Sequence, residues 1–171
     1  MSNAPAFFDI KKMDSLSSIY FKNMDDKKYI NYVNKFIDID LPSFGNRSNE
    51  LLLIYKPQIA YAKQLNDLIK DNFLSFGFEH FSDSVKEIIN TDFFKKNINC
   101  LKDIINNIQS ITLENGNDIV NKVKEITGLK GKELYMPIRI AAIGKEHGPE
   151  MNKILYIIGK EKILENINNF N

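Results

Sequence analysis

The sequence has a single cysteine, Cys100, and no tryptophan, and its two histidines, His80 and His147, lie far apart. One cysteine cannot form an internal disulfide, and no group of cysteines and histidines has the spacing of a metal site. A reducing, cytoplasmic location is therefore favoured. Because no histidine lies nearby in the sequence, Cys100 is interpreted as a buried or half-buried small side chain and not as a nucleophile.

Long apolar runs are also missing. No segment approaches the ~18 to 20 apolar residues of a membrane span, and the N-terminus lacks a basic segment followed by an apolar one. Neither membrane anchoring nor secretion is predicted. Residues 1–4 look like a remnant of an expression vector, so they are excluded from the fold argument.

Arginine is scarce, and the charges of the chain nearly cancel. Only Arg47 and Arg139 are arginines among 23 basic residues, and 22 acidic residues leave a net charge of +1. Such a chain is not drawn as a whole to nucleic acid or to a membrane, so any binding face must be local. Lysine, asparagine and isoleucine are abundant throughout, and a lysine alone is therefore a weak sign of function.

The familiar motifs of enzymes are missing as well. There is no phosphate-binding glycine loop, no HExxH and no GxSxG. Acidic pairs such as Asp25 and Asp26 are interpreted as solvated charges, since nothing around them would separate their pKa values. The segment Lys12-Met13-Asp14-Ser15 superficially resembles the KMSKS signature of class I aminoacyl-tRNA synthetases but lacks its second lysine. A free-standing enzyme is therefore disfavoured.

What is present indicates an all-α protein. Hydrophobic residues make up 43% of the chain and recur mostly at steps of three and four, which is the helical period, and no alternating run indicates a strand. Pro57 is expected to kink or divide the long periodic stretch over residues 49–73. The expected apolar faces include Leu16, Ile19 and Tyr20; Tyr29, Tyr32, Val33 and Phe36; Leu52, Leu53, Ile59, Leu65, Ile69 and Phe73.

The second half carries signals of helix ends. Ser84 and Glu87 have capping-box spacing, and Thr112 resembles an N-cap for a helix that Gly128 should end. Gly159 is expected to separate the last two helices. Residues 75–83 are the candidate boundary between two small helical modules, over residues 5–80 and 81–171.

The run TGLKGKELYMPIRIAAIGKEHGPEMNKILYIIGKEKIL, residues 127–164, resembles the C-terminal end of bacterial glutamyl-tRNA synthetases, the class I glutamate–tRNA ligases. The segment FDIKKM, residues 8–13, resembles the FDxKKL segment that follows the catalytic region of that family. The resemblance implies a pair of all-helical modules that grip the anticodon arm of a glutamate-accepting tRNA.

The same resemblance implies that the catalytic domain, which uses ATP and magnesium, would lie before residue 5. This chain would then need no cofactor of its own and would bind RNA without catalysing a reaction. It would also contact its own catalytic domain in the full-length protein, and the fragment alone is expected to be monomeric.

Within this run, Pro137 is expected at the first position of a helix, where its missing N–H costs nothing. Arg139 would then lie in the first turn beside free backbone N–H groups, a favourable place for phosphate, and its guanidinium could also stack on a base or bond its edge. The alternative is a structural salt bridge between Arg139 and a residue such as Glu133.

Other residues of the run are candidate RNA contacts. Gly144 and Gly148 permit a positive φ and a close approach of the backbone to a ligand. An equally good interpretation is a glycine C-cap and a tight turn before Pro149 starts the next helix. Lys145 and His147 on that loop are further candidates for contacting tRNA, as are Lys130 and Lys132 on either side of Gly131.

Two departures from the family pattern bear on specificity. Ile143 stands where many members carry a threonine, so no hydroxyl group is available for binding there. In the helix that contains Tyr55-Lys56-Pro57-Gln58, some members use an arginine to read the third anticodon base, and Gln58, with Lys56 beside it, is the nearest equivalent. The alternative to RNA binding is a helical protein-interaction module, for which an exposed apolar stripe would be the sign, and the sequence pattern indicates none beyond core faces.

Overall fold

The computed structural model describes residues 10–170, so residues 1–4 and the Phe8-Asp9 pair lie outside the described part of the chain. Within it there are helices and turns and no β-strand, which confirms the all-α prediction. The α-helices are α1 (Ile10–Asn23), α2 (Asp26–Val33), α3 (Ser48–Leu53), α4 (Gln64–Ile69), α5 (Asp83–Ile89), α6 (Asp92–Asn106), α7 (Gly116–Thr127), α8 (Gly131–Ile143), α9 (Met151–Ile158) and α10 (Lys160–Asn168). Short helical turns are η1 (Asn34–Phe36), η2 (Leu41–Arg47), η3 (Lys70–Leu74) and η4 (Phe78–His80).

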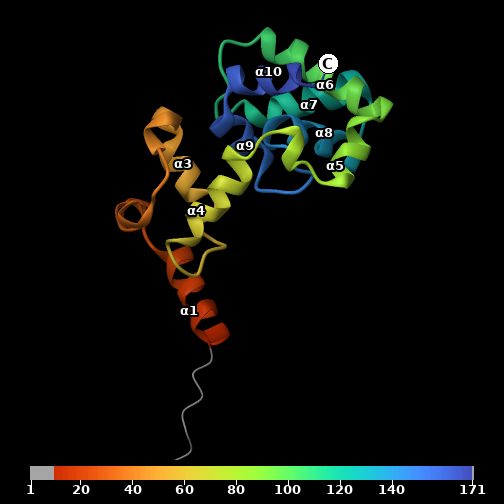
Figure 1. Cartoon of the computed structure of the whole chain (residues 1–171). Helices are drawn as coiled ribbons and strands as arrows, with labels where there is room; N and C mark the ends of the chain where they lie inside the picture. The colour runs from red at the N-terminus through yellow and green to blue at the C-terminus, as the bar shows by residue number, and fades with distance from the viewer. Residues whose placement is uncertain (1–9, 171) are drawn as a thin grey trace, which may run out of the picture.

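The molecule is elongated (Figure 1). Helices α5 to α10 gather into a rounded cluster, and the elements from α1 to η3 form an arm that extends from it. Helix α9 lies on the side of the cluster that faces the arm and contacts α3 and η2. The stretch around Pro57 is divided as predicted, because α3 ends at Leu53 and α4 begins only at Gln64.

Helix α8 lies at the centre of the cluster, against α5, α6, α7, α9 and α10. Its residues Leu134, Ile138, Ile140 and Ala141 are at most 1% exposed. Burying a large aliphatic side chain of this kind contributes about 1.5 to 3 kcal/mol, so this helix is a fixed element against which the neighbouring loops are placed.

Pro137 lies inside α8 and not at its start, so the predicted helix boundary was wrong. Proline has no N–H for the carbonyl four residues before it, which here belongs to Glu133. The buried side chain of Asn97, on α6, donates to that oxygen at 3.1 Å and to the oxygen of Leu134 at 2.9 Å. The proline is tolerated because a neighbouring helix supplies a donor.

A second buried asparagine satisfies the other end of α8. Asn166, on α10, donates to the oxygens of Ala141 and Ala142, both at 3.1 Å. These carbonyls belong to the last turn, where carbonyl oxygens have no donor within their own helix. In an asparagine-rich chain neither Asn97 nor Asn166 stands out by sequence.

The predicted glycine helix ends are confirmed, whereas two N-caps were misplaced. Gly128 ends α7 and Gly144 ends α8 in the left-handed conformation, with φ of 72° and 71°. The cap of α5 is Ser82, whose hydroxyl accepts from the N–H of Val85 at 3.1 Å, and not Ser84. Thr112 instead closes a turn with Asn115 before α7 begins, because each side chain accepts from the other's backbone N–H.

Candidate nucleic-acid interface

The loop over residues 144–150, between α8 and α9, contains four of the residues predicted to bind RNA. It begins at Gly144, whose N–H donates to the oxygen of Ile140 at 2.8 Å. A Cβ at Gly144 would lie 2.6 Å from the ring of Phe81, so both the backbone conformation and the packing require glycine. Gly148 does not have a positive φ, but a Cβ there would lie 3.0 Å from Ile143.

Arg139 holds this loop in place. Its Nη1 donates to the backbone oxygen of Glu146 at 3.3 Å, and its Nη2 donates to that of Pro149 at 3.1 Å. The side chain is half-buried, and this burial lowers the pKa of the guanidinium from its ordinary value. One planar fork thus joins both sides of the loop, which the single ammonium of lysine could not do in the same geometry.

The expected position of Arg139 in a first helical turn was wrong. It is the ninth residue of α8, remote from the free N–H groups at the start of the helix. The alternative of a salt bridge to Glu133 is not found in the described part of the chain either, where the partners of Arg139 are the two loop carbonyls. Its observed role is to position the loop.

Two further side chains fasten the loop to its surroundings. Lys145 forms an ion pair with Asp71, which belongs to the arm. Glu146 accepts a hydrogen bond from the hydroxyl of Ser84, in the first turn of α5, where the helix dipole also favours a carboxylate. Because these partners lie 74 and 62 residues away, sequence spacing contained no signal for them.

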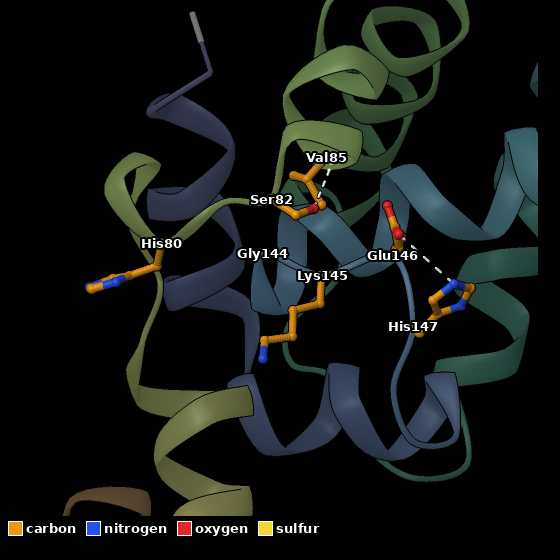
Figure 2. A pocket seen from close by; sticks show the side chains of 7 residues that line it. All are labelled: His80, Ser82, Val85, Gly144, Lys145, Glu146 and His147. Atoms are coloured by element: carbon orange, nitrogen blue, oxygen red, sulfur yellow. Dashed lines mark hydrogen bonds and ion pairs between the residues drawn. The ribbon is translucent and has the colours of Figure 1, made fainter.

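The tip of the loop is exposed. The His147 side chain is 81% exposed, with its Nε2 3.9 Å from the Glu146 carboxylate, and Gly148 beside it is also exposed. A pocket of about 260 Å³ lies between the loop, η4 and α5. Figure 2 shows His80 and His147 at opposite sides of this pocket with Lys145 between them. An imidazole held on a braced loop can stack on an unpaired base or bond its edge.

Lys130 and Lys132 do not join this loop. Both are exposed at the start of α8, where Gly131 has a φ of 53°. The loop begins at the other end of the same helix, and a rise of 1.5 Å per residue over the 12 steps from Gly131 to Ile143 separates the two places by about 18 Å. The two lysines therefore form a second, separate basic position.

Lys56 and Gln58, the two candidate residues on the arm, have different surroundings. The Lys56 ammonium donates to the backbone oxygen of Met24, forms an ion pair with Asp26 at 2.6 Å and lies 5.6 Å from the centre of the Tyr29 ring. Only 12% of its side chain is exposed. Gln58, two residues further on, is exposed. Of the two, only Gln58 can meet a ligand without breaking contacts of the fold.

No group of three or more His, Cys, Asp or Glu side chains within residues 10–170 is arranged to hold a metal ion. Over the same residues, none of the helices combines the length and the apolar character that crossing a membrane requires.

The described residues thus form an all-helical bundle that fixes an exposed loop between two largely buried helices, α8 and α9. The profile of the family described as "Anticodon binding domain" matches residues 16–170, and the chain belongs to that family.

Similar proteins include several glutamate–tRNA ligases. The chain is 39% identical to the glutamate–tRNA ligase of Malacoplasma penetrans, over 99% of this chain and 35% of the relative. It is 35% identical to that of Mycoplasma capricolum, over 98% and 35%. A crystal structure of a glutamate tRNA ligase from Elizabethkingia meningosepticum shares the fold with a TM-score of 0.74 and 18% identity, over 95% of this chain and 32% of that one. The resemblance to glutamyl-tRNA synthetases is confirmed, and the chain spans about a third of the length of these relatives.

Proposed function

We propose that this chain recognises the anticodon arm of a glutamate-accepting tRNA as part of a glutamate–tRNA ligase. The observation that carries the proposal is the match of the anticodon-binding family over residues 16–170. RNA loops are recognised through unstacked bases and phosphates, which requires a few fixed polar groups on a shaped surface. The braced loop after α8 is such a surface.

The proposed contacts divide into three positions. His147 and the backbone of Gly148 meet bases or phosphates at the loop, whereas Gly144 is buried and, like Arg139, keeps that loop in shape. Lys145 contributes if RNA displaces Asp71. Lys130 and Lys132 contact phosphates at the start of α8, where their exposed ammonium groups act as point charges.

Gln58 is the third position, on the arm, with Lys56 holding the backbone near it. An amide can donate and accept at a base edge, but it carries no charge for a phosphate. Gln58 would therefore contribute base contacts and no electrostatic attraction.

The ATP and magnesium of the ligase reaction belong to the part of the longer protein outside this chain. The described residues fit neither: they contain no carboxylate cluster for the metal, and the sequence has no phosphate-binding glycine loop. In this proposal the chain binds tRNA as a monomer in the cytoplasm, and the bond between glutamate and tRNA is made elsewhere in the ligase.

Helix α1 provides a surface for that longer protein. The sequence pattern indicated no exposed apolar stripe, and that expectation was wrong. Met13, Leu16, Ile19 and Tyr20 are 49%, 61%, 56% and 67% exposed, and in α1 only Phe21 is buried among the residues whose side chains are described. Since the relatives are about three times as long, we assign this face to contact with the remaining part of the same polypeptide.

The experiment that tests the proposed function is a binding titration of this chain with glutamate tRNA, with the same tRNA carrying a changed anticodon, and with an unrelated tRNA. The proposal requires the first to bind most tightly.

A further inference from the structure

Arg47, the other arginine of the chain, lies on the arm and caps α9, a helix of the cluster. Arg47 lies at the end of η2, on the arm, and its Nη1 donates to the backbone oxygen of Ile158 at 3.1 Å. Ile158 is the last residue of α9, where carbonyls lack partners within the helix. The Arg47 Nε also donates to the oxygen of Phe44 at 3.3 Å. One guanidinium therefore connects the backbone of the arm to the backbone of the cluster.

Gly159 makes this contact possible. It has a φ of 80°, and a Cβ added there would lie 1.9 Å from the Arg47 Nη1. Any other residue would be strained in its backbone and would push the guanidinium away. Gly159, which separates α9 from α10, thus also leaves room for the Arg47 guanidinium.

Two ion pairs and a group of aromatic rings lie at the same junction. Lys153 on α9 is 3.5 Å from Glu50 on α3, with side chains 31% and 19% exposed. Lys145 pairs with Asp71. Phe170 stacks on Phe81 at 6.0 Å and meets Phe76 edge-on at 6.0 Å. The partly buried Lys153–Glu50 pair and the packed rings resist bending more than one exposed contact does, whereas the Lys145–Asp71 pair, whose Asp71 side chain is 63% exposed, adds less.

We propose that Arg47 and Gly159 form a rigid joint that sets the angle between the two modules, which makes Arg47 a positioning residue for RNA binding. This inference depends on the proposed function, because the surfaces it aligns are the arm around Gln58 and the loop around His147. When two weak RNA contacts lie on one rigid body, forming the first places the second, and the overall affinity rises. When the two contacts lie on parts that move relative to each other, this gain in affinity is lost.

The test compares Arg47→Met with Lys102→Met. Lys102 also donates to an oxygen on another helix, Asn168 Oδ1 at 2.9 Å, but α6 and α10 both belong to the cluster. Both substitutions remove a cation and retain an apolar stem, but Arg47→Met removes the bond between arm and cluster and the bond to Phe44, whereas Lys102→Met removes one bond within the cluster. Arg47→Lys is the conservative variant, and it should recover part of the effect because it keeps the charge but not the fork.

Two quantities are measured. Spin labels on cysteines at Lys63 and Glu125, both exposed, in a Cys100→Ala background report the distance between arm and cluster. Titration of the unlabelled variants reports their affinity for glutamate tRNA. Arg47→Met should broaden the distance distribution and weaken binding roughly tenfold or more. Lys102→Met should leave both as in the parent chain.

An unchanged distance distribution in Arg47→Met would overturn the joint. A broadened distribution with unchanged affinity would overturn the positioning role. If the parent chain itself fails to bind tRNA, the proposed function fails and the positioning role with it, while the distance measurement still decides whether the joint exists.

Discussion

The guanidinium of Arg139 donates to the backbone oxygen of Pro149, ten residues further along the chain, at 3.1 Å. This bond closes the loop between α8 and α9, and the second bond to Glu146 fixes its middle. The residue that the sequence pattern assigned to direct RNA contact is therefore engaged first by its own chain. Its effect on RNA binding should follow from the shape of the loop.

Arg139→Ala should lower the free energy of unfolding by about 2 kcal/mol, because two hydrogen bonds from a charged group are removed and two carbonyls are left half-buried. Urea denaturation measures this change, and the slope of the unfolding free energy against urea concentration should stay the same. Arg139→Lys should recover less than half of the loss. If stability is unaffected while tRNA affinity falls, Arg139 reads RNA directly and the bracing role is wrong.

His147→Ala should weaken tRNA binding by about 1 to 3 kcal/mol if the imidazole stacks on a base. Its stability should stay within about 0.5 kcal/mol of the parent, because the side chain is 81% exposed. His80→Ala is the matched control, since it removes the other histidine from the opposite side of the same pocket. Equal losses in the two variants would contradict a specific role for His147.

Replacing both Lys130 and Lys132 by alanine should weaken binding at low salt and make the affinity less dependent on salt. Removing one lysine–phosphate ion pair reduces the slope of log affinity against log salt by about 0.7 to 0.9, so the slope of the double variant should fall by about 1.5. Titrations at several salt concentrations measure the slope. The control replaces Lys122 and Lys124, two exposed lysines of α7, and removes the same charge. If the Lys130/Lys132 variant shows the same salt dependence as the parent chain, these two lysines do not contact phosphates.

Cys100 should react slowly with alkylating reagents. Burial, with the charge of Asp103 adding to it, raises the pKa of the thiol above its ordinary value. The thiolate is the reactive form, so at pH 8 its fraction is smaller than in a free thiol, and the rate should rise as the pH increases. Alkylation rates from pH 7 to 10, with glutathione as reference, test this. A rate faster than that of glutathione at pH 8 would instead indicate an activated cysteine.

Features that depend on local chain geometry could be predicted from the sequence. The helical period identified the all-α fold, and Gly128, Gly144 and Gly159 were recognised as helix ends because a left-handed residue is needed there whatever surrounds it. Pro57 was recognised as a break for a similar reason.

Features that depend on partners from distant segments could not be predicted from the sequence. Pro137 lies inside α8 because Asn97 satisfies the carbonyl that the proline leaves free, and Asn97 looks like every other asparagine of the chain. Lys56 and Lys145 were candidate RNA contacts by sequence, yet both are paired with carboxylates 30 and 74 residues away. The predicted contacts therefore separate into a loop, a basic helix start and an arm.

The most direct test of the central claim is the affinity of this chain for glutamate tRNA relative to the same tRNA with one anticodon base replaced. If the chain reads the anticodon, the replacement should cost about 1 to 3 kcal/mol of binding free energy, and an unrelated tRNA should bind no better than the altered one. Equal affinity for all three RNAs, or no binding to any of them, would contradict the account.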